Sequence, residues 1–182
     1  MTQPHDAPLL TQTVIKPARH YLQWALFREM GLMVANAKHL VLVGYSLPAD
    51  DVINRCFMQS SAGGAAESPF VTVVIKDTTG GASRVAPDGW VRPANVWDYL
   101  QLNAAKGEVD EGAQNTLKSV VEVFGTGKRP DATDKFRISL HGFPCVLDGL
   151  GHGDIEVGTR RLLYPEEEDR ELAFPLTRRV VT

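Results

Sequence analysis

The sequence contains only two cysteines, and this scarcity restricts what thiols can do in the protein. Cys56 and Cys145 lie far apart in the chain and form no C-x-x-C pair. A structural zinc site needs four close thiol or imidazole ligands, and no two histidines have the spacing of metal ligands. We therefore predict two reduced, packed cysteines and no metal site.

Long apolar runs and an excess of positive charge are also missing. The chain has 19 lysines and arginines against 22 acidic residues, with a formal net charge of -3 and no basic stripe, so nucleic acid is not an expected partner. No apolar run approaches the roughly 20 residues of a membrane helix. The N-terminus lacks the charged start and apolar core of a signal peptide. We expect no membrane partner and a cytoplasmic location.

What the sequence does contain fits one globular domain. Its 182 residues are 43% hydrophobic and 23% charged, which is typical of a single soluble domain with a tail. Residues 1–17 are expected to form an extended lead-in and residues 18–149 the folded domain. Residues 150–182 are expected to form a charged tail.

Two apolar runs with a helical segment between them predict a βαβ unit. Residues 39–43 and 70–75 are rich in valine, isoleucine and leucine, as in strands that are covered on both faces of a parallel sheet. Asp50 or Asp51 can cap the intervening helix. The buried side of that helix is predicted to consist of Val52, Ile53, Cys56 and Phe57. A helix between two such strands requires parallel pairing, so we predict an α/β fold with a mostly parallel sheet.

Other segments show helical or alternating patterns. Residues 18–37 and 111–124 repeat apolar residues at helical spacing, and residues 95–102 are predicted to form a short helix. Residues 135–140 alternate polar and apolar side chains, which predicts an edge strand.

The turn after the first predicted strand is the most informative segment. It reads Gly44-Tyr45-Ser46-Leu47-Pro48 and is followed by Asp51. In open α/β sheets, ligands bind at the carboxyl ends of the strands. Glycine lets a phosphate or ribose approach the backbone, a serine hydroxyl can bond to either, and a helix N-terminus attracts anions. Gly44 and Ser46 are therefore candidate ligand-binding residues. A purely structural role, in a tight turn at the end of the strand, explains them equally well. For Asp51 we favour a helix cap.

This turn resembles a motif of sirtuin-like NAD-binding domains, in which an apolar strand runs into Gly-Tyr-Ser-Leu-Pro-x-x-Asp. Residues 136–140 and the turn Gly142-Phe143-Pro144 are similar to the C-terminal strand and turn of that family. The resemblance covers about residues 18–149 and implies a Rossmann-like fold. It also implies that Gly44, Tyr45 and Ser46 contact NAD.

Asp77 is a further candidate for binding the cofactor. It follows the second predicted strand, and an acidic residue at such a position can bind the hydroxyls of the adenosine ribose. The family often has an asparagine close by, where this chain has Lys76. An exposed loop aspartate is the competing interpretation.

The chain departs from the family in its first half. It has no glycine-rich G-x-G-x-x-G turn and no four-cysteine zinc ribbon. The family's catalytic histidine lies before the Gly-Tyr-Ser motif, but His5, His20 and His39 stand in no matching context. His141 comes too late in the chain and is expected to flank an edge strand. The domain is therefore expected to be incomplete at its N-terminal half, and a partner chain or homo-oligomer would complete it.

Three functions are compatible with these features. The chain can be the C-terminal half of a sirtuin-like NAD-consuming domain, inactive alone, of which NAD hydrolysis in a defence system is the favoured activity. It can instead be a non-enzymatic interaction module that presents the apolar side chains of residues 18–37. Finally, it can be a self-contained small α/β enzyme that uses Ser46 and Asp51.

Overall fold

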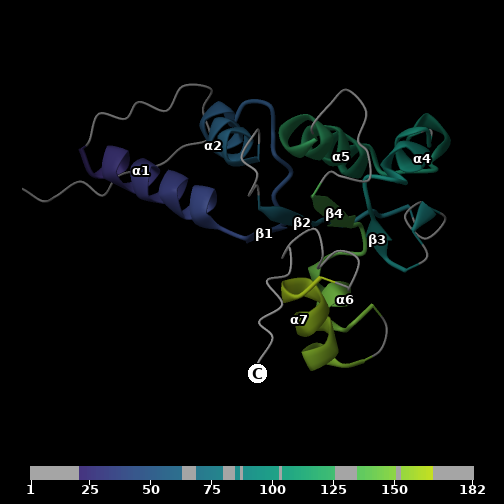
Figure 1. Ribbon diagram of the computed structural model, residues 1–182. Coiled ribbons are helices and arrows are strands. Elements are labelled where there is room, and N and C mark those ends of the chain that lie inside the picture. Colours follow the sequence, from purple (N-terminus) through teal and green to yellow (C-terminus); the bar gives the residue numbers. More distant parts are fainter. Residues whose placement is uncertain are drawn as a thin grey trace, which may run out of the picture.

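The computed structural model describes residues 21–62, 69–79, 85–86, 88–102, 104–125, 135–150 and 153–165. These residues form a mixed α/β structure with a four-stranded sheet, which confirms the predicted α/β class (Figure 1). The elements are α1 (Tyr21–Asn36), β1 (His39–Val43), α2 (Val52–Ala62), β2 (Phe70–Val74), β3 (Trp90–Val91), α4 (Val96–Leu100), the 3-10 helix η1 (Ala104–Lys106), α5 (Glu111–Phe124), β4 (Phe136–Ser139), α6 (Phe143–Leu147) and α7 (Ile155–Leu163). No helix within the described segments is long and apolar enough to cross a membrane.

The strands follow the order β1-β2-β4-β3 across the sheet. β1 is parallel to β2, with His39 opposite Phe70, and β2 is parallel to β4. The short strand β3 runs antiparallel to β4, with Trp90 opposite Ser139. Because β1, β2 and β4 run the same way, their carboxyl ends lie at the same edge of the sheet. Helix α2 connects β1 to β2, as the sequence predicts for a βαβ unit.

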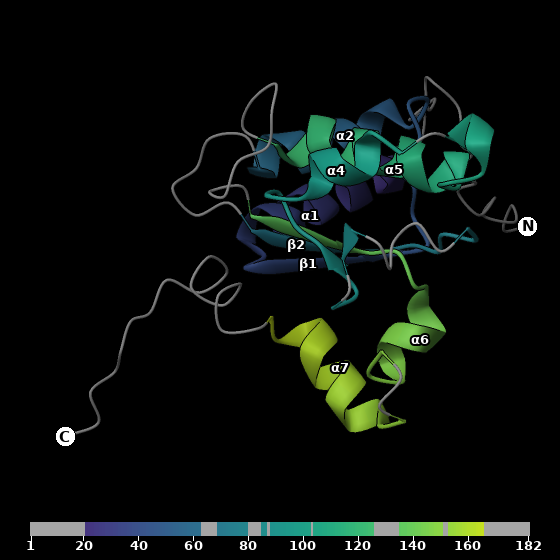
Figure 2. The ribbon, with the colours of Figure 1, turned by 90° about the vertical axis from the view of Figure 1, so that its right-hand side faces the viewer.

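Helices cover both faces of the sheet (Figure 2). α2, α4 and α5 lie on one face, and α6 and α7 lie on the other. The larger apolar core lies on the first side, where Val73 and Ile138 of the sheet cluster with Leu117 and Val120 of α5. α5 begins at Asp110, whose side chain accepts a hydrogen bond from the Ala113 amide, as expected of an N-cap. A smaller cluster on the second side joins Val74, Trp90, Val146 and Leu162.

The local sequence patterns locate several elements correctly. β1 and α5 have the predicted bounds, and β2 ends one residue before the predicted end of its apolar run. The helix predicted over residues 18–37 is described from residue 21, and there α1 ends one residue before the predicted end. α4 is shorter than predicted. The predicted lead-in of residues 1–17 lies outside the described residues.

The prediction that residues 135–140 form an edge strand is wrong. β4 lies between β2 and β3, and all four of its residues are buried. The alternating polar and apolar pattern led to a wrong prediction because the polar residues of this segment contact other groups inside the protein. Arg137 is fully buried, and its guanidinium carbon lies 4.2 Å from the centroid of the Trp90 ring. The neighbouring strand β3 has no counterpart among the elements predicted from the sequence.

The predicted buried side of α2 is also wrong in part. Cys56 is exposed, and Val52 is 42% exposed. Among the side chains of α2 that the structure describes, Arg55 is buried instead, as is Asp51 just before the helix. Both are held by the hydrogen bonds described below. The two cysteines are free thiols, but only Cys145 is even partly covered, so the prediction of packed thiols fails for Cys56.

The expected tail of residues 150–182 is described only as far as residue 165, and there it contains α7. Asp154 caps α7 by accepting hydrogen bonds from the amides of Glu156 and Val157, at 2.9 and 3.2 Å. Gly158 permits a close approach to α6, because a Cβ there would lie 2.0 Å from the carbonyl oxygen of Leu147.

Candidate functional site

The structure brings three separate turns to the carboxyl edge of the parallel strands. They are residues 44–46 after β1, residues 76–77 after β2 and residues 142–144 after β4. Backbone hydrogen bonds extend the sheet into these turns. The Gly44 amide donates to the Val74 carbonyl at 2.9 Å, and the Gly142 amide donates to the Ile75 carbonyl at 2.8 Å. The predicted site residues and the second motif of the resemblance therefore share one edge of the sheet.

Gly44 leaves open space at the end of β1. Its φ of +66° lies in the left-handed region that L side chains rarely adopt. An ideal Cβ at this position would meet no atom within 4 Å. Ser46, two residues later, is exposed. A ligand can therefore approach the backbone at Gly44 and reach the Ser46 hydroxyl.

Tyr45 fixes this turn to the start of α2. Its hydroxyl donates to Asp51 Oδ2 at 2.5 Å, and Asn54 Nδ2 donates to the same oxygen at 2.6 Å. Asp51 is only 3% exposed and directly precedes α2. Burial, reinforced by the hydrogen bond to Asp51, raises the pKa of Tyr45 to about 12. Tyr45 is thus a protonated phenol that positions the turn, and Asp51 stands at the N-cap position of α2.

Arg55 is a residue of the site that the sequence does not reveal. Its Nη1 donates to the Leu47 carbonyl at 2.8 Å, and its Nη2 pairs with Glu122 of α5 at 2.6 Å. Leu47 is fully buried and has a φ of 51°, which costs about 1–2 kcal/mol for a residue with a side chain. Arg55 and the core around Leu47 keep the turn in this strained form. Backbone strain of this kind concentrates at functional sites.

Asp77 lies at the predicted edge, but its carboxylate is engaged within the protein. Oδ1 accepts hydrogen bonds from the Thr79 amide at 2.9 Å, the Thr79 hydroxyl at 2.7 Å and the Asp110 amide at 3.3 Å. Oδ2 accepts from the hydroxyl of the buried Tyr99 at 2.9 Å. Burial and this bond raise the pKa of Tyr99. Asp77 therefore braces the loop after β2 against α4 and the start of α5.

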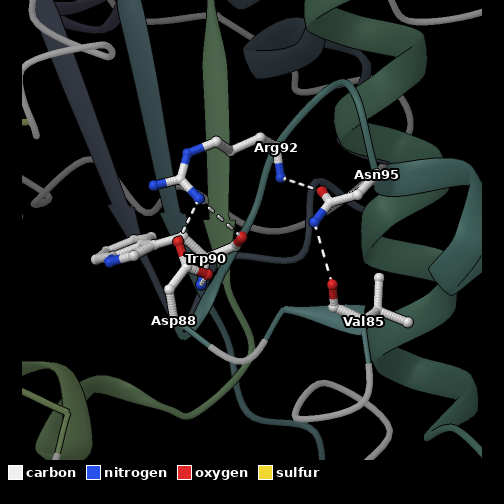
Figure 3. Close-up of polar contacts among 5 residues, drawn as sticks. All are labelled: Val85, Asp88, Trp90, Arg92 and Asn95. Atoms are coloured by element: carbon white, nitrogen blue, oxygen red, sulfur yellow. Dashed lines mark hydrogen bonds and ion pairs between the residues drawn. The ribbon is translucent and has the colours of Figure 1, made fainter.

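A second polar cluster connects the residues that precede and follow β3 (Figure 3). Arg92 Nη1 pairs with Asp88 Oδ2 at 2.5 Å, and the Arg92 amide donates to Asn95 Oδ1 at 2.7 Å. Asn95 Nδ2 donates to the Val85 carbonyl at 3.2 Å. Burial of Asp88 opposes its charge, but hydrogen bonds from Arg92 and the Trp90 amide outweigh it and lower the pKa of Asp88. These contacts explain how two residues of strand persist among turn-forming residues.

The two described histidines occupy different ends of the sheet. His39 starts β1 at the opposite edge from the candidate site, where its Nε2 lies 2.8 Å from Thr72 Oγ1. His141 pairs with Lys76 in an isolated antiparallel bridge, so it lies at the carboxyl edge. It does not flank an edge strand as expected, because β4 is central.

An open depression of about 520 Å³ runs along α7 and contains none of the predicted site residues. It is lined by Ile155, Glu156, Thr159, Arg160, Leu163 and Tyr164. Over the described segments, no group of three or more histidine, cysteine or acidic side chains is placed to hold a metal ion.

No model of a known protein family matches the chain, and neither a curated protein nor a solved structure is significantly similar to it. The resemblance to sirtuin-like domains therefore depends on the residues of the two motifs alone.

Proposed function

We propose that the chain is the C-terminal half of a Rossmann-like domain that binds NAD through the turn Gly44-Tyr45-Ser46. The observation that carries this proposal is the left-handed Gly44, with open space where its side chain would be, at the carboxyl end of β1. It stands at the strand-to-helix turn of a parallel βαβ unit, where dinucleotides bind in Rossmann folds.

The groups around this turn suit a dinucleotide. The backbone at Gly44 admits a phosphate or ribose, and the exposed Ser46 can exchange hydrogen bonds with either. The N-terminus of the 11-residue helix α2 follows the turn and attracts the negative pyrophosphate. Tyr45, Asp51 and Arg55 hold the turn in place. In sirtuin-like domains the chemistry is cleavage of the nicotinamide–ribose bond, and NAD hydrolysis in a defence system remains the favoured activity.

Catalysis in this proposal requires a partner chain, and the side of β1 that faces away from β2 is where it would join. Lys38 O and Gly44 N bond to β2, and alternate residues of a strand face the same neighbour. His39, Val41 and Val43 therefore direct their backbone groups to the other side. In the described part of the chain, β1 pairs only with β2. A doubly wound sheet continues on both sides of its first strand, so a second copy or another chain can add strands there and supply a catalytic histidine.

Gly44→Val tests the cofactor site, with Gly107→Val as its matched control. Both glycines have a positive φ, +66° and +69°, and neither has an atom within 4 Å of an added Cβ. The two variants should lose similar stability, about 1–2 kcal/mol from backbone strain. We expect calorimetry to show NAD binding to the wild type and to Gly107→Val, but not to Gly44→Val. Equal NAD affinity of all three proteins would contradict the proposal.

An interaction module without catalysis is the second candidate, and α1 supports it. Leu26, Met30 and Met33 lie on one face of α1, and Leu26 and Met33 are 56% and 73% exposed. Figure 1 shows α1 extending away from the sheet past β1. An exposed apolar stripe of this kind marks interaction surfaces.

Met33→Glu examines this second candidate. If α1 contacts a second copy, the substitution should convert oligomers to folded monomers in sedimentation equilibrium. Lys118→Glu, which changes an exposed residue of α5, should leave the oligomers intact. A wild-type chain that binds NAD as a monomer would count against the interaction module.

A further inference from the structure

Lys76 occupies the position that decides which dinucleotide a βαβ site accepts. It follows β2, the strand next to the one that ends at Gly44. In Rossmann folds, an acidic residue at this place binds the ribose 2′-hydroxyl of NAD, whereas a basic residue nearby accommodates the 2′-phosphate of NADP. The chain has both kinds of residue there, Lys76 and Asp77. The structure indicates which of the two side chains can bind a group on the ribose.

Asp77 is not available for a ribose. Its two oxygens already accept four hydrogen bonds, from Thr79, Asp110 and Tyr99. A ribose hydroxyl could bond to Asp77 only by displacing one of these donors, and the buried Tyr99 hydroxyl would then lose its partner. Displacing the Asp110 amide would instead remove one of the hydrogen bonds between the loop after β2 and the start of α5.

Lys76 is available and is oriented by the turn after β4. Its side chain is exposed, and within the described segments it has no ion-pair partner. Its stem lies along Gly142, where an ideal Cβ would be 3.4 Å from Lys76 Cβ and 3.7 Å from Lys76 Cδ. Gly142, with its φ of +81°, leaves room for this stem.

We propose that Lys76 binds a phosphate on the adenosine ribose, so that the site prefers NADP to NAD. This inference rests on the proposed function, because it assigns the dinucleotide class of the same site. A phosphate monoester carries about -1.5 to -2 charges at neutral pH, and its hydrogen bond to an ammonium is charge-assisted.

Calorimetric titration of the full chain with NAD and with NADP tests the inference. At low ionic strength we expect NADP to bind about tenfold more tightly than NAD. Lys76→Glu should abolish this preference and change NAD affinity by less than about threefold. The preference should also shrink as salt is added, since salt screens exposed charges.

Lys38→Glu is the matched control, because Lys38 is equally an exposed lysine but precedes β1 at the opposite edge of the sheet. This variant should keep the tenfold preference. Equal binding of the two dinucleotides by the wild type, or equal loss of the preference in both variants, would overturn the inference and leave the proposed function standing. Binding of neither dinucleotide would overturn the proposed function itself, and the inference with it.

Discussion

The two faces of the sheet are stabilised by different kinds of contact. On the face covered by α2, α4 and α5, the sheet packs through a large apolar cluster that includes Leu117, Val120 and Ile138. On the face that α6 and α7 cover in Figure 2, the apolar cluster is small. Buried polar groups make many of the contacts there. Apolar burial does not depend on protonation or geometry in the way that hydrogen bonds do. We therefore expect the stability of the α7 face to depend on pH and on individual hydrogen bonds, and that of the other face to depend on apolar volume.

Arg137 is the centre of the polar face. Its Nε donates to Thr72 Oγ1 at 3.0 Å, and its Nη2 donates to the carbonyls of Arg161 and Leu162 at 2.6 and 3.3 Å. These carbonyls end α7, so the cation also complements the helix dipole. The guanidinium stacks over Trp90 as well, a favourable cation–π contact.

His39 extends this network to the end of α7. Its Nδ1 lies 3.2 Å from the Leu163 carbonyl oxygen, which can only accept a hydrogen bond. Nδ1 must therefore carry the proton, and Nε2 accepts from the Thr72 hydroxyl at 2.8 Å. The neutral form of His39 fits both partners.

The largest effect should follow from Leu117→Ala on the apolar face. Leu117 is fully buried in α5, and such a substitution typically costs about 3–5 kcal/mol. Urea denaturation would measure the loss in the free energy of unfolding. Leu163→Ala is the control, because Leu163 is 46% exposed and its loss should cost less than about 1 kcal/mol. Similar costs for the two variants would break the contrast between the faces.

An intermediate effect should follow from Arg137→Met on the polar face. Methionine fills much of the same volume but donates no hydrogen bonds, so Thr72 and the last carbonyls of α7 lose the hydrogen bonds that Arg137 donates. We expect a cost of about 2–3 kcal/mol, concentrated in α7. Hydrogen exchange should accelerate in α7 and remain slow in α5. Uniform acceleration in both helices would show that the two faces unfold as one unit.

The smallest effect should be the dependence of α7 docking on pH. Burial lowers the pKa of His39 below its usual 6.5, and the positive charge of Arg137 acts in the same direction. The unfolded chain then binds more protons than the folded chain, so stability falls as the pH drops below about 6.5. Denaturation between pH 8 and pH 5 should show this loss. His39→Gln should flatten the pH dependence over this range, and an unchanged slope in that variant would assign the loss to another group.

Sequence patterns predicted the elements in which apolar residues form a continuous run or recur at helical spacing. The apolar run of β1 and the helical spacing of α5 gave the correct bounds, and the Gly-Tyr-Ser turn indicated the edge of the sheet where the candidate residues meet. β3 could not be predicted, because two residues form a strand only through pairing with β4 and the contacts of Arg92.

Buried polar residues account for the remaining errors. Arg137 gave β4 the pattern of an edge strand, although its partners come from α7 and two other strands. Arg55 gave no signal, because Leu47 and Glu122 become its neighbours only in the folded protein. Likewise, Asp77 could be recognised as a structural brace only once Tyr99 and Asp110 were placed beside it.

The measurement that tests the central claim most directly is an amide NMR spectrum of the full chain, recorded with and without NAD. The proposed site predicts dispersed peaks and shifts concentrated at Gly44, Ser46 and the first turn of α2, while the amides of α7 stay unchanged. A dispersed spectrum that NAD does not alter at Gly44 and Ser46 would contradict a cofactor site at this edge of the sheet.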